Sequence, residues 1–354
     1  MATPKELLTA AYDGETPEQT PFSMYDWFML DPRYPPAEFE PLLEMGLGLV
    51  QTISTVDVIQ HGVTRSERVE ARGRHIYHYR TIETPVGDLH SLAATPADPN
   101  EGLQEWTKEP WVKTPADYRI MQWIAAHSEC VPAYDRYAEA VEKMGEQGII
   151  TLGGLRTPAQ RINIDYAGTE QFCIDIALEV TELLDLYEAE RKLFMDYHRL
   201  VAQGPGRWVK WNENLTIEML GPGRYERFLL NIYDEVVPML EASGKRTYVH
   251  YDGNLRVIKD LIARAPFHMI ESLTEPPEGD MLYDECRAAW PDKAFAGNIN
   301  VRLYDLPDDQ FRQIIIEKRE RAGKKGFSFE ISEEVPDNWR TKIPVVLETL
   351  AELG

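Results

Sequence analysis

The chain has 354 residues and a formal net charge of −22, with 43% hydrophobic and 10% aromatic residues. This composition is typical of a globular protein, and the length suits one large barrel domain. Because such an acidic chain repels phosphate backbones, we do not expect nucleic acid as a partner. No run of about 18 apolar residues occurs, so we expect no membrane span.

The N-terminal segment and the cysteines indicate the compartment. The first stretch, "MATPKELLTAAYDGETPEQ", has no apolar signal core. Cys130, Cys173 and Cys286 are far apart and lack a metal-type spacing, so we expect reduced thiols. Both observations favour a cytoplasmic protein.

The second half of the chain alternates strand-like and helix-like segments, which is typical of a parallel sheet. The apolar stretch 148–154 and the helical pattern over 157–203 precede it, so eight strands are within reach. We predict an α/β fold, a (β/α)8 TIM barrel. A doubly wound sheet is the alternative, but no glycine-rich phosphate loop follows any strand. The expected strands of this half span 207–212, 246–251, 267–272, 294–299 and 326–331.

No internal repeat or flexible linker divides the chain, so we expect a single domain over residues 1–354. Its first part is less regular. We interpret 1–40 as an N-terminal extension with helical character, and 64–94 as a β-hairpin insertion at the barrel's edge.

Polar side chains follow five successive strands of the second half. In barrels of this kind, catalytic groups lie at the C-terminal ends of the strands. Any one of these residues is more simply a helix cap or part of a solvated loop, but their repetition favours a functional rim. The rim candidates are Trp211, Asn212, Glu213, Asn214, His250, Asp252, Asn254, Glu271, Asn298, Asn300, Glu330 and Glu333.

His250 and Asp252 are separated by one residue, so on an extended chain their side chains point to the same side. An imidazole with nearby carboxylates suits a zinc-type site. It equally suits acid-base chemistry, in which a carboxylate orients the imidazole. The spacing does not separate the two. Our catalytic candidates are Glu213, His250, Asp252 and Glu271.

Several segments together resemble the uroporphyrinogen decarboxylase-like superfamily of (β/α)8 barrels, nearest its corrinoid-dependent methyltransferase branch. The resemblance spans residues 40–353. The segment "FSMYDWFMLDPRYP" has one arginine, Arg33, where the porphyrinogen decarboxylases have an arginine-rich segment, so we do not expect uroporphyrinogen as substrate. The motifs are "ETPVGDL", "EWTKEPWVKTPADY", "TYVHYDGNL", "MIESLTEPPEGDM", "KAFAGNIN" and "FSFEISEEVP".

The resemblance implies a methyltransferase that passes a methyl group from a small methylated substrate to the cobalt of a separate, cognate corrinoid protein. It also implies a zinc site. His250 is retained, Asp252 stands at the first cysteine position, and Glu333 lies near the later one, so His250, Asp252 and Glu333 are the candidate metal ligands. Carboxylates make a harder site than thiolates, which suits a methyl group on oxygen or nitrogen.

Aromatic residues suggest an aryl methyl ether as the methylated substrate, although aromatics at strand ends are as often barrel core. The candidate substrate-binding residues are Trp27, Trp211, Asn212, Tyr251 and Asn298.

Two other functions stay open. One is a metal-independent decarboxylase of a small carboxylic acid, with Asp252 or Glu271 as a proton donor whose pKa is raised by burial. The other, a non-catalytic binding protein, leaves the acidic rim without a purpose. The oligomeric state is also open, with a homodimer as one option.

Overall fold

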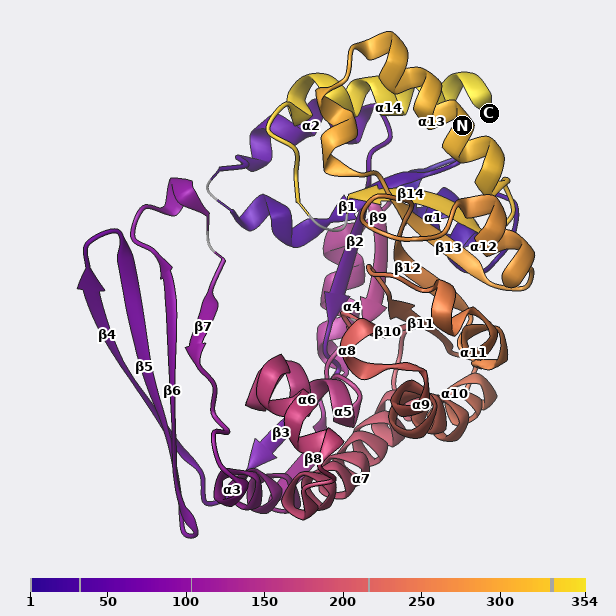
Figure 1. Cartoon of the computed structure of the whole chain (residues 1–354). Coiled ribbons are helices and arrows are strands. Elements are labelled where there is room, and N and C mark those ends of the chain that lie inside the picture. Colours follow the sequence, from indigo (N-terminus) through magenta and orange to yellow (C-terminus); the bar gives the residue numbers. More distant parts are fainter. Residues whose placement is uncertain (1, 32, 103, 216, 332–333) are drawn as a thin grey trace.

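A computed structural model describes residues 2–31, 33–102, 104–215, 217–331 and 334–354. Within these ranges, eight strands close into a barrel in the order β1-β14-β13-β12-β11-β10-β9-β2 (Figure 1). All neighbouring pairs are parallel. The strands are β1 (Phe22–Tyr25), β2 (Gly48–Ile53), β9 (Gly148–Leu152), β10 (Trp208–Trp211), β11 (Arg246–His250), β12 (Met269–Thr274), β13 (Ala294–Asn298) and β14 (Phe327–Ile331).

The predicted (β/α)8 barrel is confirmed. β1 pairs with both β14 and β2, so the sheet has no free edge and cannot be doubly wound. The five strands expected in the second half are β10 to β14. The largest shift is in β12, which begins at Met269.

Helices follow the strands and cover the outside of the barrel (Figure 1). The long amphipathic pattern after β10 is interrupted, because π-helical residues separate its first turn from its main helix. The helices are α1 (Pro4–Tyr12), η1 (Asp26–Leu30), α2 (Pro36–Glu44), α5 (Pro158–Gln160), η3 (Arg161–Ala167), α6 (Thr169–Ala177), α7 (Thr181–Gln203), α8 (Ile217–Leu220), α9 (Pro222–Tyr225), η4 (Glu226–Leu230), α10 (Asn231–Ala242), η5 (Arg256–Ile258), α11 (Lys259–Arg264), α12 (Tyr283–Ala289), η6 (Val301–Asp305), α13 (Asp308–Ala322) and α14 (Trp339–Leu353).

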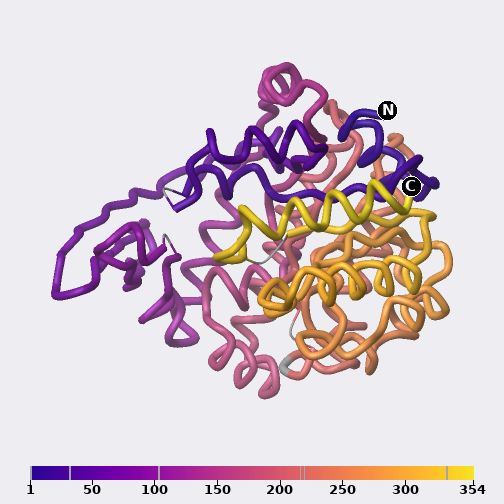
Figure 2. The backbone as a smooth tube through the Cα atoms, turned by 90° about the horizontal axis from the view of Figure 1, so that it is seen from above, coloured from indigo at the N-terminus to yellow at the C-terminus, as the bar shows by residue number. Residues whose placement is uncertain are grey.

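A large insertion separates β2 from β9. Its four-stranded antiparallel sheet, β4-β5-β6-β7, projects from one side of the barrel (Figures 1 and 2). The hairpin expected over 64–94 is therefore part of a larger sheet. The insertion contains β3 (Val56–Gln60), β4 (Thr64–Arg72), β5 (His75–Thr84), β6 (Gly87–Pro96), η2 (Pro99–Glu101), β7 (Trp106–Glu109), α3 (Pro115–Ala126), β8 (Ser128–Pro132) and α4 (Asp135–Met144).

Alternation along the strands decides which side chains enter the barrel. In β10, Lys210 points inward, where it reaches residues of β1 and β12. Its neighbour Trp211 points outward and donates its indole N–H to His198 of α7 at 2.8 Å. The aromatic core thus lies between strands and helices, and the interior of the barrel is free to hold polar groups.

No helix within the described ranges is both long and apolar enough to cross a membrane.

Close backbone packing between β2 and β9 requires glycine at position 148. A Cβ there would lie 1.8 Å from the carbonyl oxygen of Leu49. We expect Gly148→Ala to lower the free energy of unfolding by about 1–3 kcal/mol or more, as overpacking does. In the matched control Gly223→Ala, the new Cβ meets nothing within 4 Å, so the free energy of unfolding should not fall. Denaturant unfolding measures both, and equal stabilities would contradict this packing.

Candidate active site

A buried carboxylate lies inside the barrel, near the C-terminal ends of the strands. Lys210 donates to Oε1 of Glu271 at 2.7 Å. The hydroxyl of Tyr25 donates to the same oxygen and accepts from Lys210 at 2.7 Å. Tyr25 ends β1, Lys210 lies in β10 and Glu271 in β12, so the closed barrel brings together residues that are far apart in the sequence.

His250, the last residue of β11, contacts carboxylates through both ring nitrogens. Nδ1 lies 2.6 Å from Oε2 of Glu271. Nε2 lies 3.5 Å from Oδ2 of Asp252, which is too long for a strong hydrogen bond. The imidazole is 8% exposed and Asp252 is 28% exposed, so Asp252 is the more accessible partner. His250 therefore has a close carboxylate partner at Nδ1 and a more distant one at Nε2.

A bulge in β12 shapes this arrangement. The pairing of β12 with β13 shifts register between Ile270 and Leu273. Ser272, inside the shift, has a φ of 62°, which is uncommon for a residue other than glycine. Its backbone N–H donates to Oε1 of Glu330 in β14 at 2.7 Å. The bulge thus presents Glu271 to His250 and the next amide to a second buried carboxyl group.

The two carboxyl groups have pKa values shifted in opposite directions. Burial raises the pKa of Glu271, but the charges of Lys210 and His250 outweigh burial and bring it below its ordinary value. Burial and the nearby negative charge of Glu271 hold the pKa of Glu330 well above its ordinary value. Glu271 is therefore ionised and Glu330 protonated, a separation that is typical of acid-base sites.

The same balance acts on His250. Burial alone lowers its pKa, but Glu271 and Asp252 raise it to about 10. At neutral pH the ring is therefore an imidazolium cation.

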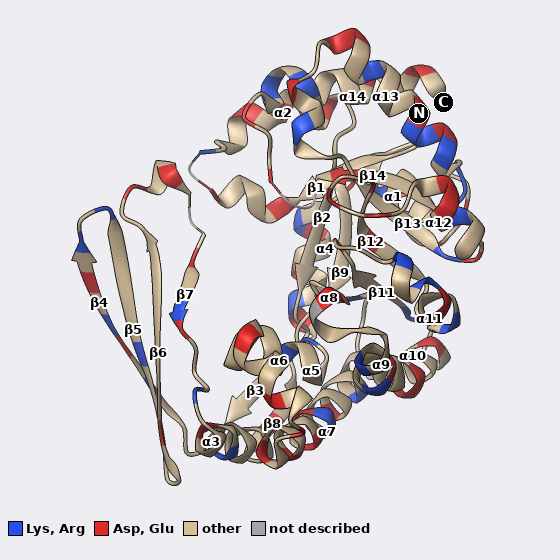
Figure 3. Ribbon diagram, in the orientation of Figure 1, with Lys and Arg blue, Asp and Glu red and all other residues tan. Residues whose placement is uncertain are grey.

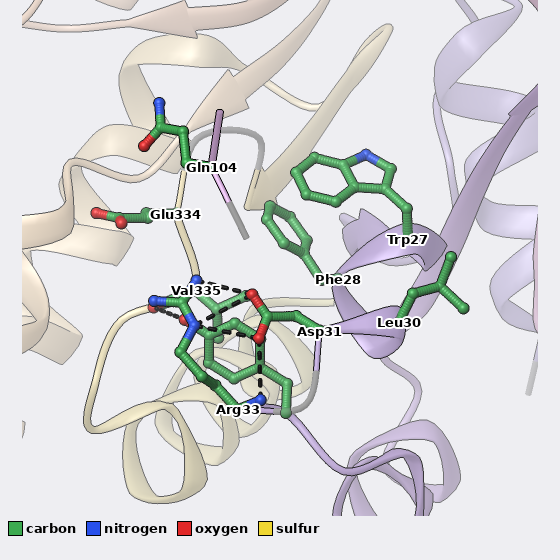
Figure 4. A pocket seen from close by; sticks show the side chains of 9 residues that line it. Trp27, Phe28, Leu30, Asp31, Arg33, Gln104, Glu334 and Val335 are labelled. Atoms are coloured by element: carbon green, nitrogen blue, oxygen red, sulfur yellow. Dashed lines mark hydrogen bonds and ion pairs between the residues drawn. The ribbon is translucent and has the colours of Figure 1, made fainter. Parts of the chain in front are cut away.

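A pocket of about 650 Å³ opens next to the end of β1, where Trp27 and Phe28 follow Tyr25. Trp27, Phe28 and Leu30 form its apolar side, and Arg33 is held by Asp31 at 2.8 Å (Figure 4). The ring of Tyr25 stacks on Trp27 with centroids 5.8 Å apart. Tyr25 therefore links the aromatic wall of the pocket to the charged cluster. The remaining lining residues are Tyr34, Gln104, Glu334 and Val335.

The structure brings together three of the four predicted catalytic residues, His250, Asp252 and Glu271. Glu213 lies apart from them. It accepts from Thr157 at 2.7 Å and lies beside Tyr233 of α10, on the helix side of β10. Burial raises its pKa to about 7.

The predicted substrate-binding residues are scattered. Trp27 lines the pocket and is 51% exposed. Trp211 stacks on Tyr233, and the Tyr251 hydroxyl bonds that of Tyr233 at 2.8 Å, so both aromatics belong to the core between strands and helices. Two polar candidates complete the set: Asn212 is exposed and its carbonyl accepts from Arg156, while Asn298 is buried at the end of β13.

Comparison with solved structures finds the same fold in a methyltransferase from Methanosarcina mazei. The two chains are 13% identical, the match covers 100% of this chain and 99% of the other, and the TM-score is 0.56. The chain shares the barrel of that protein. The resemblance found in the sequence is thus confirmed at the level of the fold.

A B12-independent methionine synthase from a Shewanella species, solved with selenomethionine, also matches. It is 9% identical, with 90% of this chain and 85% of that chain covered, and the TM-score of 0.43 is too low to support an argument. No family model and no curated protein matches the chain.

Tyr25 and Lys210 were missed by the sequence analysis, and Glu330 was noted only as a rim residue. Lys210 did carry a signal. In "RWVKWN" it is a charged residue inside an aromatic strand, and a buried lysine needs a partner. Tyr25 carried no comparable sequence signal, because the four-residue strand β1 was not recognised.

Zinc was expected on His250, Asp252 and Glu333. Glu333 lies outside the described residues. Among the residues that are described, no group of three histidine, cysteine or acidic side chains is placed to hold a metal ion. Nδ1 of His250 is taken by Glu271, and the ammonium group of Lys210 already neutralises that carboxylate. The described side chains by themselves do not fit a zinc centre, and the zinc ligand set stays a prediction that depends on Glu333.

The raised pKa of His250 predicts a pH dependence of stability. Because the folded pKa is about 10 and the ordinary value is 6.5, the stabilising contribution is complete below pH 6.5 and lost as the pH rises towards 10. We expect the free energy of unfolding of the wild type to fall over this range relative to His250→Gln. His268, whose pKa burial lowers to about 4, provides the control His268→Gln, which should keep the alkaline fall. Parallel pH curves for all three proteins would contradict the assignment.

Proposed function

We propose that the protein is a methyltransferase that moves a methyl group from a small methylated substrate, such as an aryl methyl ether, to the cobalt of a corrinoid on a separate protein. The observation that carries the proposal is the buried imidazolium of His250, whose two ring nitrogens face the carboxylates of Glu271 and Asp252. The fold shared with the methyltransferase from Methanosarcina mazei supports it.

Transfer of the methyl group breaks the O–CH₃ bond, and the oxygen keeps the electron pair. When the partner is bound, its corrinoid supplies the cobalt nucleophile that accepts the methyl group. The departing oxygen then needs a proton, and in this proposal Nε2 of His250 donates it. Nδ1 keeps its own proton, which it donates to Glu271, so the ring becomes neutral in a defined tautomer. Asp252, the more exposed partner, lies where a new proton from solvent can return to Nε2.

The acidity of His250 suits this step. Its pKa of about 10 is close to that of a phenol, about 10 for tyrosine. Proton transfer to a phenolate oxygen is then close to balanced. The aromatic wall formed by Trp27 and Phe28 provides an apolar surface for such a ring.

The charges in the site favour a neutral substrate over a carboxylate. Lys210 and His250 are balanced by Glu271 and Asp252, and Glu330 is uncharged. In the pocket, Arg33 is held by Asp31. The decarboxylase alternative needed a raised pKa on Glu271 or Asp252, but the pKa of Glu271 is lowered and the raised one belongs to Glu330. We therefore place decarboxylation second.

Substitution of His250 tests the proposal. We expect His250→Gln to lower methyl transfer at least ~100-fold, the usual scale for a general acid, with the fold intact. Asp252→Asn should also lower it, because the charge that orients Nε2 is lost while the shape is kept. His268→Gln is the matched control. The assay follows the methylation of cob(I)alamin by its absorbance, with a panel of aryl methyl ethers, and circular dichroism checks the fold.

Release of CO₂ from small aromatic acids is measured in parallel with the methyl-transfer assay. Decarboxylation without methyl transfer, or full transfer by His250→Gln, would overturn the proposal.

Metal removal tests the general-acid mechanism separately. If His250 itself supplies the proton to the leaving oxygen, transfer should survive dialysis against a chelator. Elemental analysis of the dialysed protein reports the residual metal. Activity that is lost on dialysis and restored by zinc alone would instead assign the leaving-group role to a metal held by His250, Asp252 and Glu333.

A further inference from the structure

Strand β4 forms an exposed edge of the inserted sheet. Eight of its nine residues are exposed and one, Glu70, is half-buried. β4 pairs with β5 on one side, and among the described strands none pairs with its other side. It is the strand of this sheet farthest from the barrel (Figure 1). An edge of this length presents unpaired N–H and C=O groups to another strand.

We propose that β4 pairs antiparallel with β4 of a second copy of this chain, with Val69 on the two-fold axis. This two-fold axis is perpendicular to the joined sheet, so each side chain and its copy lie on the same face. Directly opposed residues of an antiparallel pair also share a face, so the axis must pass between one residue and the same residue of the second copy. A centre on Glu67, Arg68 or Glu70 places that residue's charge against itself. A centre on Val69 places Arg68 opposite Glu70 of the partner subunit, twice, and lets residues 66–72 pair.

The charges along β4 are already ordered on one face of the sheet. Arg68 lies over the ring of Tyr79 at 4.0 Å and donates to Glu70 at 3.0 Å. Arg72 donates to both oxygens of Glu70 at 2.6 and 2.9 Å. A guanidinium group has several N–H donors, so Arg68 can keep its place on Tyr79 and still reach Glu70 of the partner subunit.

Val69 lies on the opposite face and is 54% exposed. On the axis it would be covered by Val69 of the partner subunit, which removes apolar surface from water.

A charged edge can also serve to prevent pairing. An edge of one sign repels its copy, whereas β4 carries both signs in alternation (Figure 3). The pairing joins the two inserted sheets into one. A single strand pair is smaller than the ~1,600 Å² of a standard interface, so we expect a dissociation constant in the micromolar range.

Sedimentation equilibrium over a concentration series tests the dimer, and a charge swap tests the register. We expect Arg68→Glu to raise the dissociation constant at least ~10-fold, because the introduced carboxylate would face Glu70 of the partner subunit. The double variant Arg68→Glu/Glu70→Arg should restore it, since opposite charges face each other again. Arg264→Glu, on an exposed face of α11, is the control and should change nothing.

Two further measurements make the result decisive. Val69→Lys places two ammonium groups on the axis and should also separate the copies. In the wild type, amide hydrogen exchange in β4 should slow as the concentration rises. A monomer at every concentration, a dimer that Arg68→Glu leaves intact, or a double variant without rescue would overturn the proposal, whatever the methyl-transfer assay shows.

Discussion

A carboxylate buried in the middle of a barrel must be matched by positive charge, and this requirement governs the interior of the protein. Glu271 is 1% exposed, and Lys210 and His250 from the two preceding barrel strands neutralise it. Removing one partner of such a buried pair typically costs about 3–5 kcal/mol, because an unpaired charge is left behind. The cation on His250 is thus part of the folded structure, and the fold itself keeps its proton in place.

The bulge in β12 turns this balance into a site with two kinds of carboxyl group. It brings Glu271 to His250 and the amide of Ser272 to Glu330. Two ionised carboxylates so close to each other in a dry interior would repel strongly, so one stays protonated. Ionised Glu271 fixes the imidazolium, and neutral Glu330 adds no charge. Among the described residues of this cluster the charges of Lys210, His250, Glu271 and Asp252 therefore cancel, which is the physical reason why the proposed substrate is neutral.

The sequence was informative where its pattern was local. β10 to β14 were predicted because strands and helices alternate regularly there, and His250 and Asp252 because both lie at one strand end. The cluster itself depends on distant pairs: Lys210 and Tyr25 are 185 residues apart, and Lys210 and Glu271 are 61 apart. Only barrel closure sets these distances. Glu213 was grouped with the rim because it directly follows a predicted strand, but the chain turns there, with the amide of Glu213 bonded to the carbonyl of Trp211.

The inserted sheet reaches from the pocket to the outside of the molecule, and its two edges have different surroundings. Gln104, in the connection between β6 and β7, lines the pocket on the side of Glu334, across from Trp27 (Figure 4). The connection that leads into β7 thereby contributes to this pocket, whereas no residue of β4 is among its described lining residues. Pairing through β4 would extend the sheet away from the barrel. Under the proposed function, each barrel mouth would stay open to a substrate and to a corrinoid-bearing partner. The proposed dimer and the proposed methyl transfer would then use separate parts of the molecule.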